Sequence, residues 1–205
     1  MLVLDHLAVA GDTLTAARDH VEAALGVSMQ PGGEHAVFHT HNALLGLEDG
    51  LYLEAIAINP TAPAPDRARW FDLDRFEGGP RLTNWICRTA DLETALAALG
   101  PEMGAPVALR RGDLRWRMAV PQSGVLPYDN CAPALITWDT QQHPALMLAH
   151  SGIRLRRLTI RHPQAARICD RLAPHLADDR LSYEQGAAGL HAVFDTPQGP
   201  RELGK

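Results

Sequence analysis

The chain has 205 residues, of which 46% are hydrophobic and 21% charged, a balance typical of a globular protein with a packed core. Its formal net charge of -5 argues against nucleic acid or an anionic membrane surface as a partner, because both attract basic proteins. No apolar stretch approaches the roughly 20 residues that span a bilayer, and the amino terminus lacks a basic leader. With three cysteines that show neither metal nor disulfide spacing, we expect a cytoplasmic protein.

The first 60 residues are predicted to form a strand, a helix and two or three further strands. The apolar run at 2–9 is expected to be a buried strand, and Asp12 is expected to cap a helix that ends at Gly26. Apolar residues recur along one face of that helix at Leu14, Ala17, Val21, Ala24 and Leu25. The later strands, the last two joined by an Asp-Gly turn, are expected at 36–38, 41–47 and 51–58.

A proline-rich, charged connector at 61–80 separates this module from a second one with the same order of elements. Its aromatic residues are expected to anchor it to the core: Trp70, Phe71 and Phe76. The second module covers 81–148, with a strand, a helix and three strands at 82–88, 91–99, 107–109, 114–120 and 134–138. A shift of 78 residues places His6 on Asn84, so the second module is interpreted as a duplicate of the first.

The remaining residues, 149–205, predict a partial third module of βαββ order. Its strand, helix and two further strands are expected at 153–160, 163–176, 181–184 and 190–194. The expected fold class is therefore α+β, with repeated βαβββ modules and a partial third one. Residues 1–148 are expected to form one domain and 149–205 a C-terminal unit.

Two polar residues stand in the middle of apolar strands. His6 is expected to share a strand face with Leu4 and Ala8, and Glu54 to share one with Tyr52. If both point into the same curled sheet, the imidazole and the carboxylate make half of a site for Zn, Mn, Fe or Ni. The alternative is a core histidine that is hydrogen-bonded to the glutamate.

Three further histidines lie close together at His35, His39 and His41, where an extended strand would place them on one face. Because Gly32 and Gly33 come first, His35 is expected in a loop. Only His41 is kept as a candidate pocket residue. The other histidines show no ligand spacing.

Three short motifs carry a resemblance to a known family: Leu4-Asp5-His6-Leu7, Thr40-His41-Asn42-Ala43-Leu44 and Tyr52-Leu53-Glu54. Over about residues 2–150 the chain resembles the glyoxalase-like domain branch of the vicinal oxygen chelate superfamily. The resemblance implies paired βαβββ modules that form a curled mixed or antiparallel sheet around a pocket, with metal ligands on the first and last strands of each module.

In that scheme His6 and Glu54 occupy the ligand positions of module one. In module two Asn84 matches His6, and Thr137 or Trp138 matches Glu54. The ligand set is therefore incomplete unless His41, Asp139 or a partner chain adds to it.

The leading hypothesis is a small-molecule enzyme of lyase, isomerase or dioxygenase type. A divalent metal held by His6, Glu54 and His41 would chelate vicinal oxygens, and Glu54 or His41 would double as the base. The substrate pocket is expected to be lined by Tyr52, Asn84, Arg88, Trp116 and Trp138, which suits a flat or apolar molecule.

Two alternatives stay open. One is a metal-free protein that binds and sequesters a small molecule, as members of the bleomycin-resistance group do. The other is a vestigial pocket in a domain whose role is dimer formation. A homodimer fits either case, since modules in this superfamily also pair between chains.

Overall fold

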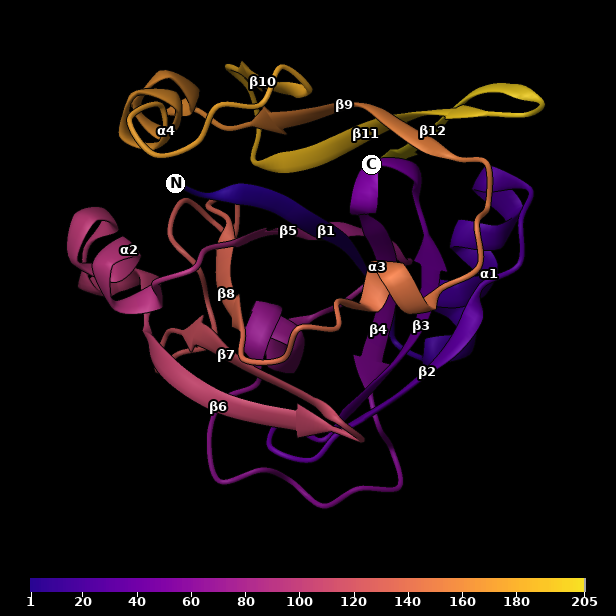
Figure 1. The fold of residues 1–205 in the computed structure, drawn as a ribbon, viewed down its shortest axis with the longest axis horizontal. Coiled ribbons are helices and arrows are strands. Elements are labelled where there is room, and N and C mark those ends of the chain that lie inside the picture. The colour runs from indigo at the N-terminus through magenta and orange to yellow at the C-terminus, as the bar shows by residue number, and fades with distance from the viewer. Residues whose placement is uncertain (205) are drawn as a thin grey trace.

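The computed structural model describes residues 1–204 and confirms an α+β fold of repeated modules (Figure 1). Module one contains β1, α1, β2, β3 and β4, at Val3–Ala10, Leu14–Leu25, Gln30–His35, Thr40–Gly46 and Tyr52–Ile58. Module two contains β5, α2, β6, β7 and β8, at Arg81–Arg88, Leu92–Leu99, Ala105–Arg111, Leu114–Val120 and Ala134–Trp138. Four short helical segments lie in the connections between these elements or after β8: Glu48–Gly50 (η1), Trp70–Arg75 (η2), Pro101–Met103 (η3) and Pro144–Met147 (α3).

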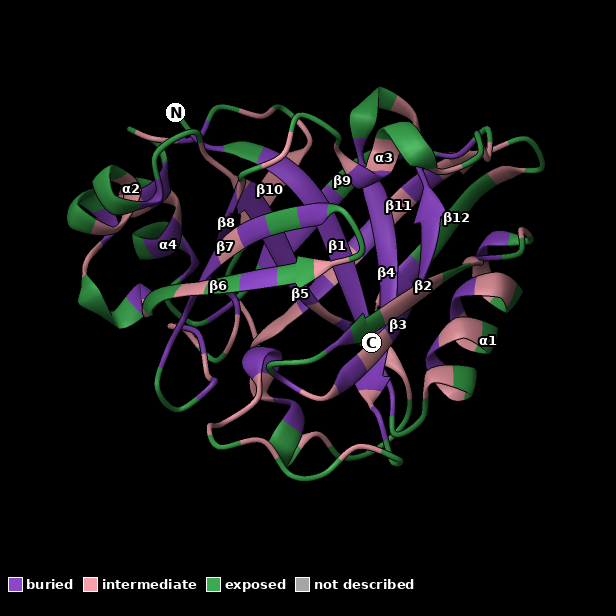
Figure 2. Ribbon diagram, turned by 60° about the horizontal axis from the view of Figure 1, so that its bottom comes forward, coloured by how far each residue is buried: buried purple, intermediate pink, exposed green. Residues whose placement is uncertain are grey.

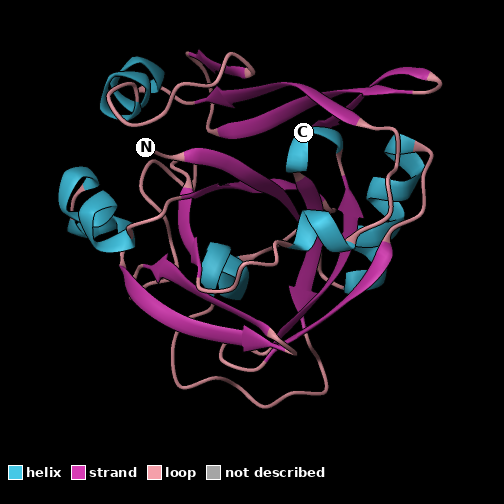
Figure 3. Cartoon of the chain, in the orientation of Figure 1, coloured by secondary structure: helices cyan, strands magenta, loops and turns pink. Residues whose placement is uncertain are grey.

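One eight-stranded sheet contains both modules, in the order β2-β3-β4-β1-β5-β8-β7-β6. β1 pairs in parallel with β4, β5 pairs in parallel with β8, and β1 meets β5 antiparallel at the centre. The sheet curls until its edge strands β2 and β6 come into contact, so the strands surround a concave interior (Figure 3). The curled sheet expected from the sequence is thus confirmed.

The pairing at the centre of this sheet reveals the duplication directly. Leu7 of β1 pairs with Trp85 of β5, and these two residues are equivalent under the shift of 78. The flanking pairs, His6 with Ile86 and Ala8 with Asn84, are symmetric about them. A local twofold axis therefore relates the modules, and it confirms the match of His6 to Asn84.

The C-terminal unit forms a second sheet of order β10-β9-β11-β12. Its elements β9, α4, β10, β11 and β12 lie at Arg154–Arg161, Ala165–Leu172, Leu181–Glu184, Gly189–Thr196 and Gly199–Gly204. β12 is not predicted from the sequence, because Gly-Pro-Arg-Glu-Leu-Gly has little β-propensity and becomes a strand by pairing with β11.

The C-terminal sheet covers the convex side of β1 and β5 (Figure 1). Leu158, Ala192 and Phe194 from this sheet join the same core as Trp85 and Cys87. The central strands are accordingly buried, while the outer surfaces of the helices are exposed (Figure 2). No helix of residues 1–204 is long and apolar enough to cross a membrane.

Two local predictions in module one are wrong. Thr13 rather than Asp12 caps α1, since the Thr13 hydroxyl accepts a hydrogen bond from the backbone N–H of Ala16. The strand predicted at 36–38 is a turn, and the strand instead covers 30–35 with both glycines inside it.

The glycines of β2 permit close approach by two side chains. A Cβ atom at Gly32 would lie 2.0 Å from Oδ1 of Asn42, and one at Gly33 would lie 2.6 Å from Cδ of Arg111. Gly32 and Gly33 are therefore required by contacts across the sheet rather than by a loop.

Candidate functional site

The concave face of the eight-stranded sheet encloses a small cavity of about 20 Å³, room for about one water molecule. Module one contributes mainly polar residues to its wall: His6, His35, Asn42, Leu44, Tyr52 and Glu54. Module two contributes mainly apolar ones: Arg111, Trp116, Met118, Ile136 and Trp138. Trp70 and Phe71 of the connector complete the wall, so the connector packs on the core as predicted.

A β-bulge in β1 explains why a polar pair reaches this interior. The register with β5 shifts between Leu4 and His6, which leaves Asp5 as the extra residue. Leu4 consequently packs in the outer core, whereas Ala8 packs in the inner one. The prediction that His6 shares a face with Ala8 is confirmed, and the prediction for Leu4 is wrong because the bulge breaks the alternation.

Asp5 is fully buried and lies at the centre of a hydrogen-bond network. Its Oδ1 lies 2.6 Å from Nδ1 of His6, and its Oδ2 accepts from Nε1 of Trp138 at 3.1 Å and from Nε2 of His143 at 2.8 Å. Nη1 of Arg88 adds an ion pair at 3.5 Å. Asp5 was not predicted as a site residue, although a polar residue inside an apolar strand is the signal that identified His6.

These donors keep Asp5 ionised. Burial alone would raise the pKa of Asp5, but the hydrogen bonds and charges of His143 and His6 outweigh it and hold the pKa well below its usual range. Because an ionised carboxylate only accepts hydrogen bonds, His6 carries a proton on Nδ1 and turns Nε2 toward the cavity.

Nε2 of His6 faces Glu54, with 3.7 Å between Nε2 and Oε2. The His6 ring also stacks on Tyr52, at 4.2 Å between centroids. Nδ2 of Asn42 donates to Oε1 of Glu54 at 2.5 Å, and Oδ1 of Asn42 accepts from Nη1 of Arg111 at 3.0 Å. Asn42 therefore fixes one oxygen of Glu54 and leaves the other directed at His6.

His35 closes the network on the side of β2. Its Nδ1 lies 2.9 Å from Oγ1 of Thr40, and its Nε2 lies 3.4 Å from Nδ2 of Asn42. Burial, reinforced by the nearby cationic side chain of Arg111, lowers the pKa of His35 to about 3. The prediction of a loop at His35 is wrong: this histidine ends β2 and lies inside, neutral near pH 7.

The structure does not bring His41 to the cavity. Side chains alternate along β3, so Asn42 and Leu44 face the interior while His41 shares the opposite face with Ala43. The third ligand and base proposed from the sequence thus lies on the wrong side of its strand, one residue from the position that faces inward.

Of the other residues predicted to line the pocket, three line the cavity and two do not. Tyr52, Trp116 and Trp138 line the cavity. Arg88 does not line the cavity but forms an ion pair with Asp5. Asn84 is fully buried beside Ala8, and neither of its amide atoms has a hydrogen-bond partner within the described residues.

The residues present do not fit the divalent metal ion that the family resemblance implies. Ala8 pairs with Glu54, and its duplicate Ile86 pairs with Ala134, so Ala134 rather than Thr137 or Trp138 is the counterpart of Glu54. Ala134 has no donor atom. In residues 1–204 no three His, Cys, Asp or Glu side chains are grouped so as to hold a metal.

The module-two positions therefore supply an amide and a methyl group where two ligands would be needed. The guanidinium of Arg111 also lies in the cavity wall, where it would repel a cation. His6 and Glu54 alone make a weak site.

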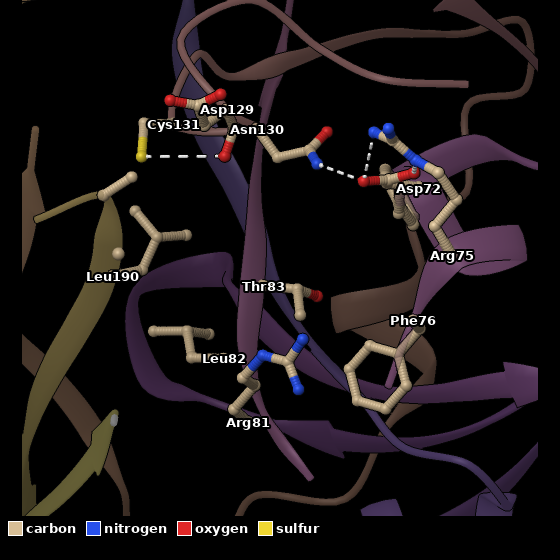
Figure 4. A pocket seen from close by; sticks show the side chains of 13 residues that line it. Asp72, Arg75, Phe76, Arg81, Leu82, Thr83, Asp129, Asn130, Cys131 and Leu190 are labelled. Atoms are coloured by element: carbon tan, nitrogen blue, oxygen red, sulfur yellow. Dashed lines mark hydrogen bonds and ion pairs between the residues drawn. The ribbon is translucent and has the colours of Figure 1, made fainter. Parts of the chain in front are cut away.

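A second cavity, of about 210 Å³, lies between the connector, β5 and the C-terminal sheet (Figure 4). Its polar groups largely satisfy one another: Asp72 pairs with Arg75 at 2.7 Å and accepts from Asn130 at 3.4 Å. Arg81 lies over the ring of Phe76 at 4.2 Å. The interior of the curled sheet is the better candidate, because there the free Nε2 of His6 faces a carboxylate.

Comparison with known proteins agrees with this architecture. A family model described as a glyoxalase-like domain matches residues 4–176. A crystal structure of a hypothetical protein from Staphylococcus aureus shares the fold, with 13% identity, a TM-score of 0.58 and coverage of 100% of this chain and 85% of that one.

Two epimerase structures have lower TM-scores. Methylmalonyl-CoA epimerase from Mycobacterium tuberculosis has 21% identity and a TM-score of 0.41, over 66% of this chain and 85% of that one. The Streptomyces coelicolor methylmalonyl-CoA epimerase in complex with 2-nitronate-propionyl-CoA has 20% identity and a TM-score of 0.44, over 68% of this chain and 100% of that one. No curated protein matches the sequence.

Proposed function

The chain belongs to the glyoxalase-like domain family, and from that premise we propose that it acts on a small molecule by proton transfer, without a divalent metal ion. The observation that carries the proposal is the buried series Asp5, His6 and Glu54, directed into the interior of the curled sheet. Two proton-exchanging groups that face each other across a small gap can take a proton from a ligand and return it.

Each residue has a distinct part in this proposal. Asp5 orients His6 and stabilises its charge when Nε2 takes a proton. Asn42 holds Glu54 through Oε1, so that only Oε2 is available to the ligand. Tyr52 supports the flat face of the His6 ring. Trp116 and Trp138 exclude water, which strengthens these electrostatic interactions.

The test follows carbon-bound hydrogen. The protein would be incubated in D₂O with enolisable ketones and 2-keto acids, and loss of their C–H signals would be followed by NMR. We expect protein-dependent exchange that survives treatment with a chelator and falls about 10²–10⁴-fold in His6→Gln. His191→Gln, at a partly exposed histidine paired with Glu202 in the C-terminal sheet, is the matched control and keeps full activity.

Exchange that stops with chelator and returns with added metal would refute the metal-free mechanism. Equal rates in wild type and His6→Gln would refute the role of His6.

Sequestration without chemistry is the second candidate. It is favoured by the module-two wall, which presents aromatic and aliphatic surface but no reactive group to a ligand: Trp116, Met118, Ile136 and Trp138. A sequestering protein would retain a ligand unchanged through dialysis, with the same affinity in wild type and His6→Gln.

A further inference from the structure

The cavity beside His6 is too small for the body of an organic ligand. Its volume of about 20 Å³ accommodates little more than the reacting end of a molecule. The remainder has to lie outside the sheet, in a space that communicates with this cavity.

An outer pocket of about 330 Å³ meets that requirement. It lies between the edge strand β2, the β6–β7 hairpin and α3, and it shares Leu44 and Arg111 with the inner cavity. Its volume falls within the usual range for small-molecule sites, about 300–1,000 Å³. These two side chains form the boundary between the inner and outer spaces.

Arg111 gives the boundary a positive charge that no side chain balances. No Asp or Glu oxygen of residues 1–204 forms an ion pair with Arg111, whereas the half-buried Arg171 and Arg180 are each paired with a carboxylate. Within residues 1–204 the side chain of Arg111 makes one hydrogen bond, from Nη1 to Oδ1 of Asn42. A guanidinium has five N–H donors in a planar fork, so Arg111 keeps donors for a second partner.

The other walls of the outer pocket are mainly apolar. Leu114, Pro144, Met147 and Leu148 line it together with Leu44. Met147 is 61% exposed, and the neighbouring Leu146 is 77% exposed. Exposed large apolar side chains next to a pocket are typical of a surface that contacts a ligand.

We propose that the outer pocket binds the apolar body of a small monocarboxylic acid whose carboxylate pairs with Arg111. This inference rests on the proposed function and names its substrate class. A single negative charge is favoured over a phosphate dianion because Asp113, which also lines the pocket, would oppose a second one. Bound in this way, such an acid has its carboxylate at the boundary, next to the inner cavity that His6 and Glu54 line.

The test uses hexanoate as the probe and hexanamide as its neutral match. Two-dimensional ¹H–¹⁵N NMR would follow the titration at constant ionic strength. We expect saturable shifts at the backbone N–H groups of Gly32 and Gly112, which line the pocket, with hexanoate at least about tenfold tighter than hexanamide.

Three variants test whether the charge of Arg111 determines the affinity for hexanoate. Arg111→Gln is expected to weaken hexanoate about tenfold and to leave hexanamide unchanged, while Arg110→Gln, an exposed neighbour outside the pocket, leaves both unchanged. Asp113→Asn is expected to tighten hexanoate. Equal affinity for acid and amide, or unaltered binding of hexanoate in Arg111→Gln, would overturn the inference.

Binding at this pocket does not need His6. His6→Gln should therefore bind hexanoate as the wild type does, even though proton exchange is lost. Failure of hexanoate binding alongside normal exchange would overturn this inference alone, whereas normal binding without exchange would overturn only the proposed function.

Discussion

Asp5 and His35 are both buried, yet their surroundings lead to opposite charge states. Asp5 keeps its negative charge because two histidines, a tryptophan and an arginine approach it. His35 loses its positive charge because burial disfavours the charged imidazole, and the nearby guanidinium of Arg111 adds to this effect. The interior thus holds one fixed anion at Asp5 and an uncharged imidazole at His35.

The depressed pKa of His35 makes stability depend on pH. Its pKa falls from 6.5 to about 3 on folding, so the stabilisation is complete above pH 6.5 and is lost as the pH falls toward 3. We expect this residue to contribute a slope of about 1.4 kcal/mol per pH unit to the free energy of unfolding between pH 6 and pH 4.5. Urea denaturation of wild type and His35→Gln at several pH values measures it.

His35→Gln should lack this slope, whereas His191→Gln should retain it. Protonation of Asp5 lowers the free energy of unfolding only below about pH 4, because folding lowers the pKa of Asp5 from an ordinary carboxyl value. The same slope in His35→Gln and wild type would show that His35 is protonated in the folded protein.

The residues of the site were partly predictable. His6, Glu54, Tyr52, Trp116 and Trp138 were identified because polar or aromatic residues stood at inward positions of apolar strands. Asp5, His35 and Asn42 were not, because their direction depends on a bulge and on a strand boundary. A shift of one residue exchanges the two faces of a strand, which is how His41 was chosen in place of its neighbour.

At the scale of elements, alternation and helical spacing predicted most strands and helices, including all five elements of module two. The elements that were not predicted are those whose structure depends on contacts with distant parts of the chain. The two glycines of β2 leave room for Asn42 and Arg111, which lie close to its backbone. β12 is a strand because it pairs antiparallel with β11. Neither contact is visible in local sequence.

The C-terminal sheet supplies large side chains to the core of the main sheet, and Phe194 of β11 is fully buried there. We propose that the two sheets unfold as one unit. Phe194→Ala should then lower the free energy of unfolding by about 3–5 kcal/mol in a single transition, measured by urea denaturation and tryptophan fluorescence.

Phe76→Ala in the connector is the matched control, and it should cost under about 2 kcal/mol because Phe76 is only partly buried. Two separate transitions, with the main sheet unchanged at the wild-type midpoint, would show instead that the C-terminal unit is independent.

At the scale of the whole molecule, the twofold relation between modules identifies the two positions that lack metal ligands, Asn84 and Ala134. Restoring both donors should therefore create a site. We expect the double variant Asn84→His with Ala134→Glu to bind about one Zn²⁺ per chain, measured by inductively coupled plasma mass spectrometry, while the wild type does not.

A double variant with Gln at both positions controls for size, since the added volume alone costs about 1–3 kcal/mol. Circular dichroism would verify that both double variants are folded. A folded His and Glu variant that retains no more zinc than this control would contradict the assignment of equivalent positions.

The unequal divergence of the two modules has a stereochemical consequence. Module one kept the ionisable groups, and module two became an aromatic and aliphatic wall. The reacting end of a ligand in the inner cavity would have His6 and Glu54 on the side of module one and Trp116 and Met118 on the side of module two. A proton would then be exchanged from one side only, so the proposed proton transfer is expected to give a single enantiomer.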